Sequence, residues 1–323
     1  MVILLIKNQE IQTKNHQEIM QTKSIRIVAA IPSAAVVALA PLQIATAANV
    51  LFQADFNGTP VSDVGNGLYA AQITAANLDA GTAVGSWTVH VPQDAPAAGT
   101  ARAQRGIQGV GAADVENKAL RFGINLAGQS TGGADPILSA NLATSASVST
   151  TMPMTVGFDY ANGSPDGGNR TFFLRGLDSS ERILFELAFK HTGAGGSAEQ
   201  RQLHYRDGSS QFVSLGNTGD ESTLVNTTQS GNVEAATYDP DIMKRVEVVI
   251  GSSAFDILLD GSMLAGDIAF QDVDADGLTK LDFASTNQWT GGWFDNMEVT
   301  QIPEPSAAAL LALGGLALLS RRR

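Results

Sequence analysis

Residues 245–261 read Arg-Val-Glu-Val-Val-Ile-Gly-Ser-Ser-Ala-Phe-Asp-Ile-Leu-Leu-Asp-Gly. In the first six of them, valine and isoleucine alternate with Glu247, and this alternation predicts a β-strand with one buried and one wet face. A short Gly-Ser-Ser turn leads to a second apolar run, which ends at Asp260-Gly261. Asp-Gly supplies the positive φ angles of a tight hairpin, so we expect the next strand to begin near Met263.

The same period of two recurs along the chain, and no long segment keeps a period of 3.6 residues. One face groups Val156, Phe158 and Tyr160 against Asp159, and another groups Phe185, Leu187 and Phe189 against Glu186 and Lys190. The predicted strands are residues 50–56, 86–91, 119–124, 154–160, 171–177, 182–190, 202–205, 211–215, 245–250, 254–259, 280–284 and 292–300. We therefore predict an all-β fold, a two-sheet antiparallel sandwich.

Turn and loop residues separate these strands. Asp207-Gly208 predicts a second tight hairpin. Residues 57–85, 95–115 and 216–241 are rich in Gly, Ala, Asn, Ser and Thr, so we expect long surface loops there, where a binding function would lie.

The N-terminus predicts an export signal that begins late. Lys23 and Arg26 precede an uncharged, mostly apolar run over residues 27–42, and Ala45-Thr46-Ala47 fits a small-x-small cleavage site. We predict a signal helix within residues 1–47, with translation starting at Met20; a genuine extended n-region is the alternative.

The C-terminus has three parts in order. Pro303-Glu304-Pro305 precedes the uncharged residues 307–319, which are followed by Arg321, Arg322 and Arg323. A helix of that apolar run would span roughly 20 Å of a bilayer core about 30 Å thick. The pattern favours transient membrane insertion of a hydrophobic helix stopped by basic residues. A short permanent anchor or a buried helix is the alternative.

This arrangement over residues 302–323 resembles the PEP-CTERM sorting signal of Gram-negative bacteria. The resemblance implies export, recognition by an exosortase near Pro303, Glu304 and Pro305, and removal of the tail. It also implies a destination at the cell surface, the outer membrane or an exopolysaccharide matrix.

The body between these ends, residues 48–301, is one predicted domain with no cysteine. It holds 13 Lys and Arg against 29 Asp and Glu, a net charge of −16. This charge disfavours nucleic acid as a partner and is compatible with a divalent cation. The absence of cysteine excludes thiol chemistry and disulfides.

Parts of the body resemble concanavalin A-like and laminin-G-like jelly rolls and related carbohydrate-binding modules. These parts are the hairpin of residues 245–265, the opening Val-Leu-Phe-Gln-Ala-Asp-Phe-Asn-Gly of residues 50–58, and the closing Trp-Phe-Asp-Asn-Met-Glu-Val of residues 293–299. The resemblance implies a jelly roll whose terminal strands lie side by side, and it leaves the activity open.

Catalytic patterns are missing from the sequence. His90, His191 and His204 are scattered, and neither a Gly-x-Ser-x-Gly elbow nor a His-Glu-x-x-His pair occurs. The Glu-x-Asp-x-x-Glu pattern that glycosidases of this fold often carry is absent, and Glu181 and Glu186 would point to opposite faces of a strand. We therefore expect no enzyme activity.

Two groups of carboxylates are candidates for calcium. Asp272, Asp274 and Asp276 precede a glycine, as in a calcium loop, although the acidic twelfth residue of an EF-hand is missing. Asp295 shares a face with apolar residues and must be paired if buried; Asp55 on the first strand could join it around the ion. The alternatives are a solvated acidic turn and, for Asp295, the capping of local backbone amides.

Sugar binding would use exposed aromatic rings, and Trp289 and Tyr205 are the candidates. Our leading hypothesis is a non-catalytic carbohydrate-binding or matrix-associated module. A structural or adhesive protein without a small ligand is the alternative, and a glycosidase follows it.

Overall fold

The computed structural model describes residues 48–65, 68–90, 106–110, 114–122, 136–149, 152–162, 170–191, 201–209, 211–215, 243–285 and 292–301. The signal segment, the C-terminal tail and the segment 216–241 lie outside these residues, so the two predicted terminal helices stay predictions. The described part is nearly all strand, which confirms the all-β prediction. No helix in it is long and apolar enough to cross a membrane.

The described elements, in chain order, are β1 (Asn49–Ala54), β2 (Ser62–Gly65), β3 (Leu68–Ala71), α2 (Ala75–Ala80), β4 (Thr82–Val84), β5 (Ser86–Val89), β6 (Gly106–Val110), β7 (Asp114–Phe122), β8 (Leu138–Ser147), β9 (Met154–Asn162), β10 (Arg170–Leu177), β11 (Ile183–His191), β12 (Arg201–Arg206), β13 (Phe212–Ser214), β14 (Lys244–Ile250), β15 (Ala254–Leu259), β16 (Ser262–Ala269), β17 (Gly277–Ser285) and β18 (Gly292–Gln301).

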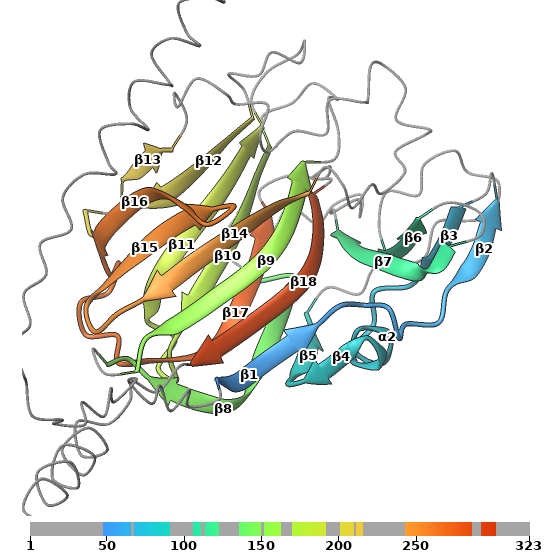
Figure 1. Cartoon of the computed structure of the whole chain (residues 1–323), viewed down its shortest axis with the longest axis horizontal. Helices are drawn as coiled ribbons and strands as arrows, with labels where there is room; N and C mark the ends of the chain where they lie inside the picture. Colours follow the sequence, from blue (N-terminus) through green and yellow to red (C-terminus); the bar gives the residue numbers. More distant parts are fainter. Residues whose placement is uncertain are drawn as a thin grey trace, which may run out of the picture. The chain divides into compact units, whose positions relative to one another are not determined.

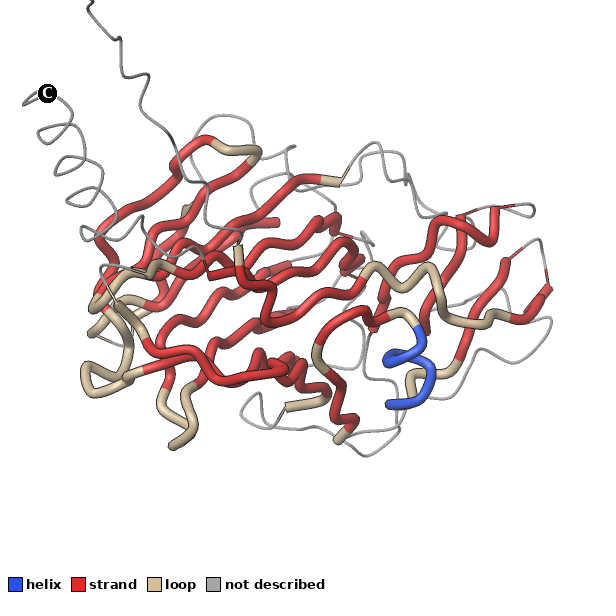
Figure 2. Tube along the Cα trace, turned by 60° about the horizontal axis from the view of Figure 1, so that its bottom comes forward, coloured by secondary structure: helices blue, strands red, loops and turns tan. Residues whose placement is uncertain are grey.

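The strands form two antiparallel sheets that stack as a sandwich (Figure 1). The larger sheet has 11 strands in the order β16-β15-β14-β9-β18-β7-β6-β3-β2, with β1 paired to β18 and β4. The smaller sheet has seven strands in the order β13-β12-β11-β10-β17-β8-β5. The described helix, α2, lies beside β4 and β5 (Figure 2).

The first and last strands lie side by side, as the jelly-roll resemblance implied. β1 runs antiparallel to the second half of β18, from Asn49 opposite Gln301 to Ala54 opposite Met297. The other edge of β18 pairs with β9 over most of its length. The last strand is therefore a central strand, and it completes the larger sheet.

Both predicted hairpins are present, but the positive φ angles expected of Asp-Gly occur at Asp260-Gly261 and not at Asp207-Gly208, where the connection runs from residue 207 to residue 211. Asp260 and Gly261 join β15 to β16 with φ angles of 48° and 75°, the left-handed values that a two-residue turn of this kind requires. Asp207 and Gly208 join β12 to β13, and the Asp207 carboxylate accepts a hydrogen bond from the Ser209 amide at 3.0 Å.

Aromatic rings from both sheets meet in the core around Phe294 of β18. Its ring centroid lies 4.9 Å from Tyr160 on the same sheet and 5.1 Å from Phe172 on the opposite sheet. Trp87 is buried in this core, and Trp293 is buried in a separate small cluster with Ala119. The inner faces of the two sheets are thus filled by side chains, and ligand binding has to use the outer faces or the loops.

Strand β11 differs from the predicted pattern of one dry and one wet face. Phe185, Leu187 and Phe189 are buried as expected, but Glu186 is only 1% exposed and Ala188 is fully covered. The expectation that Glu186 faces water is wrong because side chains of neighbouring strands cover the outer face of the sheet at this point.

The prediction of surface loops at residues 57–85 and 95–115 is also wrong in part. The first segment contains β2, β3, α2 and β4, and the second contains β6 and the start of β7. Leu78 of α2 is fully buried, and Thr74 caps the helix by accepting a hydrogen bond from the Asn77 amide at 3.2 Å. These elements are three to six residues long with mostly small side chains, so they leave no clear period in the sequence. The prediction for residues 216–241 falls outside the described residues.

A buried lysine ties this region to the sandwich. Nζ of Lys118 on β7 donates hydrogen bonds to the backbone carbonyls of Asn57, at 2.5 Å, and Thr59, at 2.7 Å. Lys118 is 6% exposed. Burial lowers the pKa of its ammonium group below the ordinary value, and the nearby Asp55 carboxylate acts against that shift.

We expect Lys118→Met to lower the free energy of unfolding by about 3 kcal/mol, because two backbone carbonyls lose their donor inside the protein. The matched control is Lys244→Met. Lys244 makes a partly exposed ion pair with Asp260 at 3.1 Å, so its loss should cost less than about 1 kcal/mol. Urea denaturation of the two variants measures the difference, and equal costs would contradict this role of Lys118.

Candidate functional site

A row of side chains crosses the outer face of the seven-stranded sheet at right angles to the strands. The row takes one residue from each of β5, β8, β17, β10, β11, β12 and β13. Strand register places neighbouring members opposite one another, except that the members from β11 and β12 are joined by an ion pair. At about 4.8 Å between strands, the row is roughly 29 Å long. We call it the transverse row; its members are Thr88, Ser139, Asp282, Arg175, Glu186, Arg206 and Phe212.

The centre of the transverse row is one carboxylate between two guanidinium groups. Oε1 of Glu186 lies 3.5 Å from Nη2 of Arg175 and 3.5 Å from Nη2 of Arg206, and Oε2 lies 3.0 Å from Nε of Arg206. The Glu186 side chain is 2% exposed, while those of Arg175 and Arg206 are 13% and 25% exposed. The anion therefore lies beneath, and the two cations reach the surface.

Aromatic rings hold both guanidinium groups in place. Arg206 lies over the ring of Phe212 at 4.4 Å and Arg175 over that of Phe173 at 5.2 Å. The two rings contact each other with centroids 5.9 Å apart. Such contacts stabilise the guanidinium planes in a fixed orientation.

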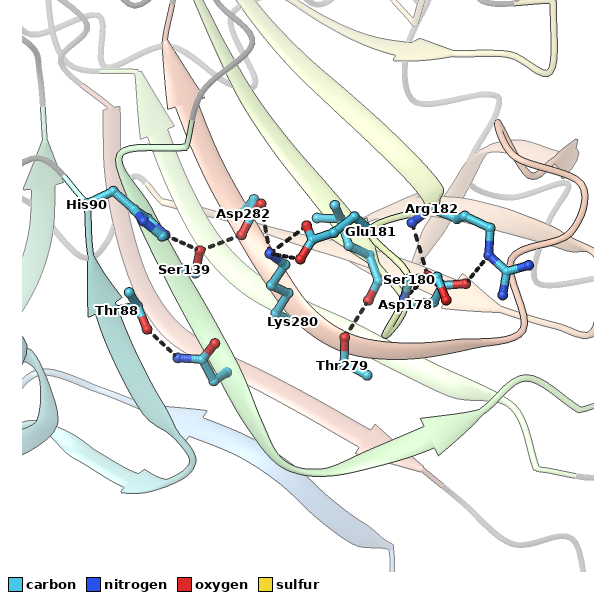
Figure 3. A network of polar contacts seen from close by, with 12 residues as sticks. Thr88, His90, Ser139, Asp178, Ser180, Glu181, Arg182, Thr279, Lys280 and Asp282 are labelled. Atoms are coloured by element: carbon cyan, nitrogen blue, oxygen red, sulfur yellow. Dashed lines mark hydrogen bonds and ion pairs between the residues drawn. The ribbon is translucent and has the colours of Figure 1, made fainter.

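A second polar chain runs from β5 toward the β10–β11 turn (Figure 3). Nε2 of His90 lies 2.8 Å from Oγ of Ser139, which donates to Oδ1 of Asp282 at 2.5 Å. Oδ2 of Asp282 lies 3.6 Å from Nζ of Lys280, which pairs with Oε2 of Glu181 at 2.7 Å.

This chain contains the residue types of a serine nucleophile in the wrong order. In a catalytic triad the histidine stands between the serine and the carboxylate, so that it can take the hydroxyl proton. Here Ser139 is in the middle and gives its only proton to Asp282, so Nε2 of His90 must be the donor to Oγ. Ser139 is also only 2% exposed. The arrangement positions side chains and does not activate the hydroxyl.

The acidic loop predicted as a calcium site is docked on the turn between β10 and β11. Oδ2 of Asp272 accepts a hydrogen bond from the Ile183 amide at 2.6 Å. Oδ1 of Asp276 pairs with Arg182 at 3.1 Å, and Asp274 is exposed. Two of the three carboxylates thus have partners within the protein.

The second predicted group combines Asp55, just after β1, with Asp295 on β18, and these two strands pair. Asp295 is buried, and its Oδ1 accepts a hydrogen bond from the Asn296 amide at 2.7 Å, within a bulge where Asn296 has a φ of 46°. Oδ1 of Asp55 accepts from the Asn57 amide at 3.0 Å. Capping of local amides is therefore one role of both carboxylates. Among the described residues, no group of three or more His, Asp or Glu side chains is placed to hold a metal ion, and calcium binding stays a prediction.

The other predicted site residues are not gathered with these. Tyr205 packs against the main core, while its neighbours on β12, His204 and Arg206, project to the other face. Trp289 and the six residues of the predicted sorting signal lie outside the described part of the chain.

The sequence analysis missed the ion-paired group at the centre of the transverse row, which we call the central triad: Arg175, Glu186 and Arg206. A signal was present: Arg175 interrupts the apolar run Phe-Phe-Leu-Arg-Gly-Leu, and Glu186 interrupts Ile-Leu-Phe-Glu-Leu-Ala-Phe. A charge within a buried strand needs a partner of opposite charge on the next strand.

Residues 301–323 match the family model described as the PEP-CTERM protein-sorting motif. The C-terminus of this chain is a PEP-CTERM sorting motif. It marks the chain as an exported, envelope-associated protein and implies an exosortase as its processing partner. The PEP-CTERM motif directs the protein to the cell envelope and does not indicate what the β-sandwich binds or does.

No curated protein matches the chain. Similar solved structures include the alginate lyase AlyC3, at 12% identity with a TM-score of 0.34, covering 57% of this chain and 75% of that one. A tetrameric galectin from the ball sponge Cinachyrella sp. has 15% identity and a TM-score of 0.31, covering 51% and 97%. The cellulose-induced protein Cip1 has 14% identity and a TM-score of 0.35, covering 60% and 84%. Structural similarity at TM-scores this low does not indicate a function for this chain.

The β10–β11 turn beside the row is held by a buried carboxylate. Oδ1 of Asp178 accepts from the amides of Ser180, at 2.7 Å, and Arg182, at 3.0 Å, and Oδ2 accepts from Nε of Arg182 at 2.6 Å. Burial acts to raise the pKa of Asp178, but these hydrogen bonds and the Arg182 charge together lower it below the ordinary value.

We expect Asp178→Asn to lower the free energy of unfolding by about 2 kcal/mol at pH 7. A carboxyl group whose pKa is depressed by folding stabilises the protein above its unfolded pKa and loses that effect as pH falls through its folded pKa. The gap between the original chain and the variant should therefore shrink below about pH 4. Urea denaturation at pH 7 and pH 3 tests this, with Glu181→Gln as the exposed control in the same turn. A gap that does not change with pH would contradict it.

Proposed function

We propose that this exported protein is a non-catalytic polysaccharide-binding module, and that the polysaccharide lies along the transverse row. The observation that carries the proposal is the row itself: polar side chains from six adjacent strands, aligned by register and partly exposed at both ends. Its length suits several sugar rings in line rather than a single one.

The chemistry of the row supports a sugar ligand. Hydroxyl groups of sugars both donate and accept hydrogen bonds, and the row offers donors on Arg175 and Arg206 and a hydroxyl on Thr88. His90 and Asn141 add exposed or partly exposed polar groups at the β5 end, where Nδ2 of Asn141 donates to Oγ1 of Thr88 at 3.0 Å. These side chains project from strands of a rigid sheet, so little freedom is lost on binding.

Two features favour binding without catalysis. The hydroxyl of Ser139 is buried and donates to Asp282. The carboxylates of Glu186 and Asp282 are buried and ion-paired, whereas a glycosidase needs one carboxyl group to give a proton to the substrate and the other to act as nucleophile or base.

A structural or adhesive protein without a sugar ligand is the second candidate. The mutual pairing of charges along the row favours it, because these side chains are already satisfied in part without a ligand. We place the protein at the cell surface or in an exopolysaccharide matrix in either case, and direct binding measurements separate the two candidates.

The full-length chain, purified in a mild detergent, should bind polysaccharides on an array in a saturable way and release no reducing ends. Thr88→Val and His90→Ala should each weaken binding roughly two- to tenfold, because each removes one hydrogen-bonding group from the row. Thr155→Val, on the outer face of the other sheet, is the matched control and should bind normally. Repeating the array with calcium and with chelator tests the calcium prediction.

Failure of a folded chain to bind any polysaccharide would leave the structural function. Reducing ends whose release is lost in Asp282→Asn would establish a glycosidase instead.

Sorting has its own test. Alanine substitution of Pro303, Glu304 and Pro305 together should block exosortase processing in a Gram-negative host that has the enzyme, because it removes the extended recognition segment. Mass spectrometry of the exported protein should then find only the uncut chain, whereas the original chain is shortened. Alanine substitution of Thr300, just before the matched residues, is the control. Normal processing of the triple variant would contradict the assignment of the cleavage signal.

A further inference from the structure

The two outer faces of the sandwich carry opposite arrangements of charge. On the seven-stranded sheet, Glu186 stands between Arg175 and Arg206. On the 11-stranded sheet, Arg245 stands between Asp159, at 3.4 Å, and Glu298. The first group has one positive charge in excess and the second has one negative charge in excess.

The excess positive charge is exposed, and the compensating negative charge is not. Arg206 is 25% exposed and Glu186 beneath it is 2% exposed. On the neighbouring strand β17, Lys280 is shared between Asp282 and the exposed Glu181, so this group has one negative charge in excess. The transverse row is thus polarised, with its positive end at β10–β12.

The guanidinium of Arg206 is oriented before any ligand arrives. It stacks on Phe212 at 4.4 Å, and its Nε is buried, 3.0 Å from Glu186 but without hydrogen-bond geometry to any described residue. The side of the guanidinium that carries Nε and Nη2 faces Glu186, and the remaining N–H groups of this planar cation can donate to a carboxylate or sulfate group.

We propose that the ligand of the transverse row is an acidic polysaccharide, and that Arg206 and Arg175 bind its anionic group, the carboxylate of a uronic acid or a sulfate ester. This inference rests on the proposed function. The net charge of the chain, −12, opposes an anionic ligand at long range, but screening at physiological salt confines that repulsion to about 8 Å, so the contacts at the row decide.

The test compares polymers that differ only in charge. The full-length chain is titrated in 0.15 M salt, roughly the physiological ionic strength, with polygalacturonate and its methyl ester, and with dextran sulfate and dextran. We expect at least one charged polymer to bind about tenfold more tightly than its neutral counterpart. Preference for polygalacturonate identifies a carboxylate as the bound group, and preference for dextran sulfate identifies a sulfate.

Two substitutions in the triad should act in opposite directions. Arg206→Gln should weaken binding of the charged polymer roughly tenfold and that of its neutral counterpart much less, because glutamine keeps a hydrogen-bond donor but loses the charge. Glu186→Gln removes the negative charge beneath the guanidinium groups and should tighten binding of the charged polymer roughly two- to fivefold. A gain of affinity cannot come from misfolding. Arg245→Gln, equally exposed on the other sheet, is the control and should change nothing.

Equal affinity for charged and neutral polymers, with binding still weakened in Thr88→Val, would overturn this inference and leave the proposed function standing. Sensitivity to Arg245→Gln but not to Arg206→Gln would overturn it by placing the anion on the other face. No binding of any polymer would overturn both proposals.

Discussion

The packing of Phe294 between the two sheets is the contact on which the rest of the structure depends. Its ring lies 4.9–5.9 Å from five other aromatic rings, two on its own sheet and three on the opposite one. Aromatic pairs of this kind add about 0.5–1.5 kcal/mol each to the burial of their apolar surface. Because β18 is a central strand that also receives β1, this one position couples the closure of the fold to the stacking of the sheets. Side chains therefore fill the space between the sheets, and the candidate binding groups lie on an outer face of the sandwich.

In the proposed function, the same residues on the outer face of the seven-stranded sheet stabilise the fold and bind the ligand. Burying Glu186 is costly unless it is paired, and Arg175 and Arg206 supply the pairing from the strands on either side. The pairing in turn fixes the two guanidinium groups where they reach the surface. The proposed binding site needs no mobile loop, because the pairing of the strands sets the spacing of its groups.

The sequence predicted the long strands and both Asp-Gly hairpins because alternation and turn residues are local signals. It could not predict the short elements of residues 62–84, whose small side chains leave no period, nor β8, which is rich in Ser, Ala and Thr. The candidate site was harder to predict from the sequence than the strands. Glu186 was read as a wet-face residue, since the position of Arg206 opposite it depends on pairing between strands. Long-range register is a tertiary property that no local pattern carries.

The most direct measurement of the central claim observes the arginine side chains themselves. Nε–Hε resonances of the full-length chain are followed by NMR during titration with oligogalacturonate and, separately, with a sulfated oligosaccharide. The account predicts that the resonances of Arg175 and Arg206 shift and saturate with one of these ligands while those of Arg245 and Arg182 stay in place. Shifts confined to Arg245 or Arg182, or none at Arg206 when ligand binds, would contradict it.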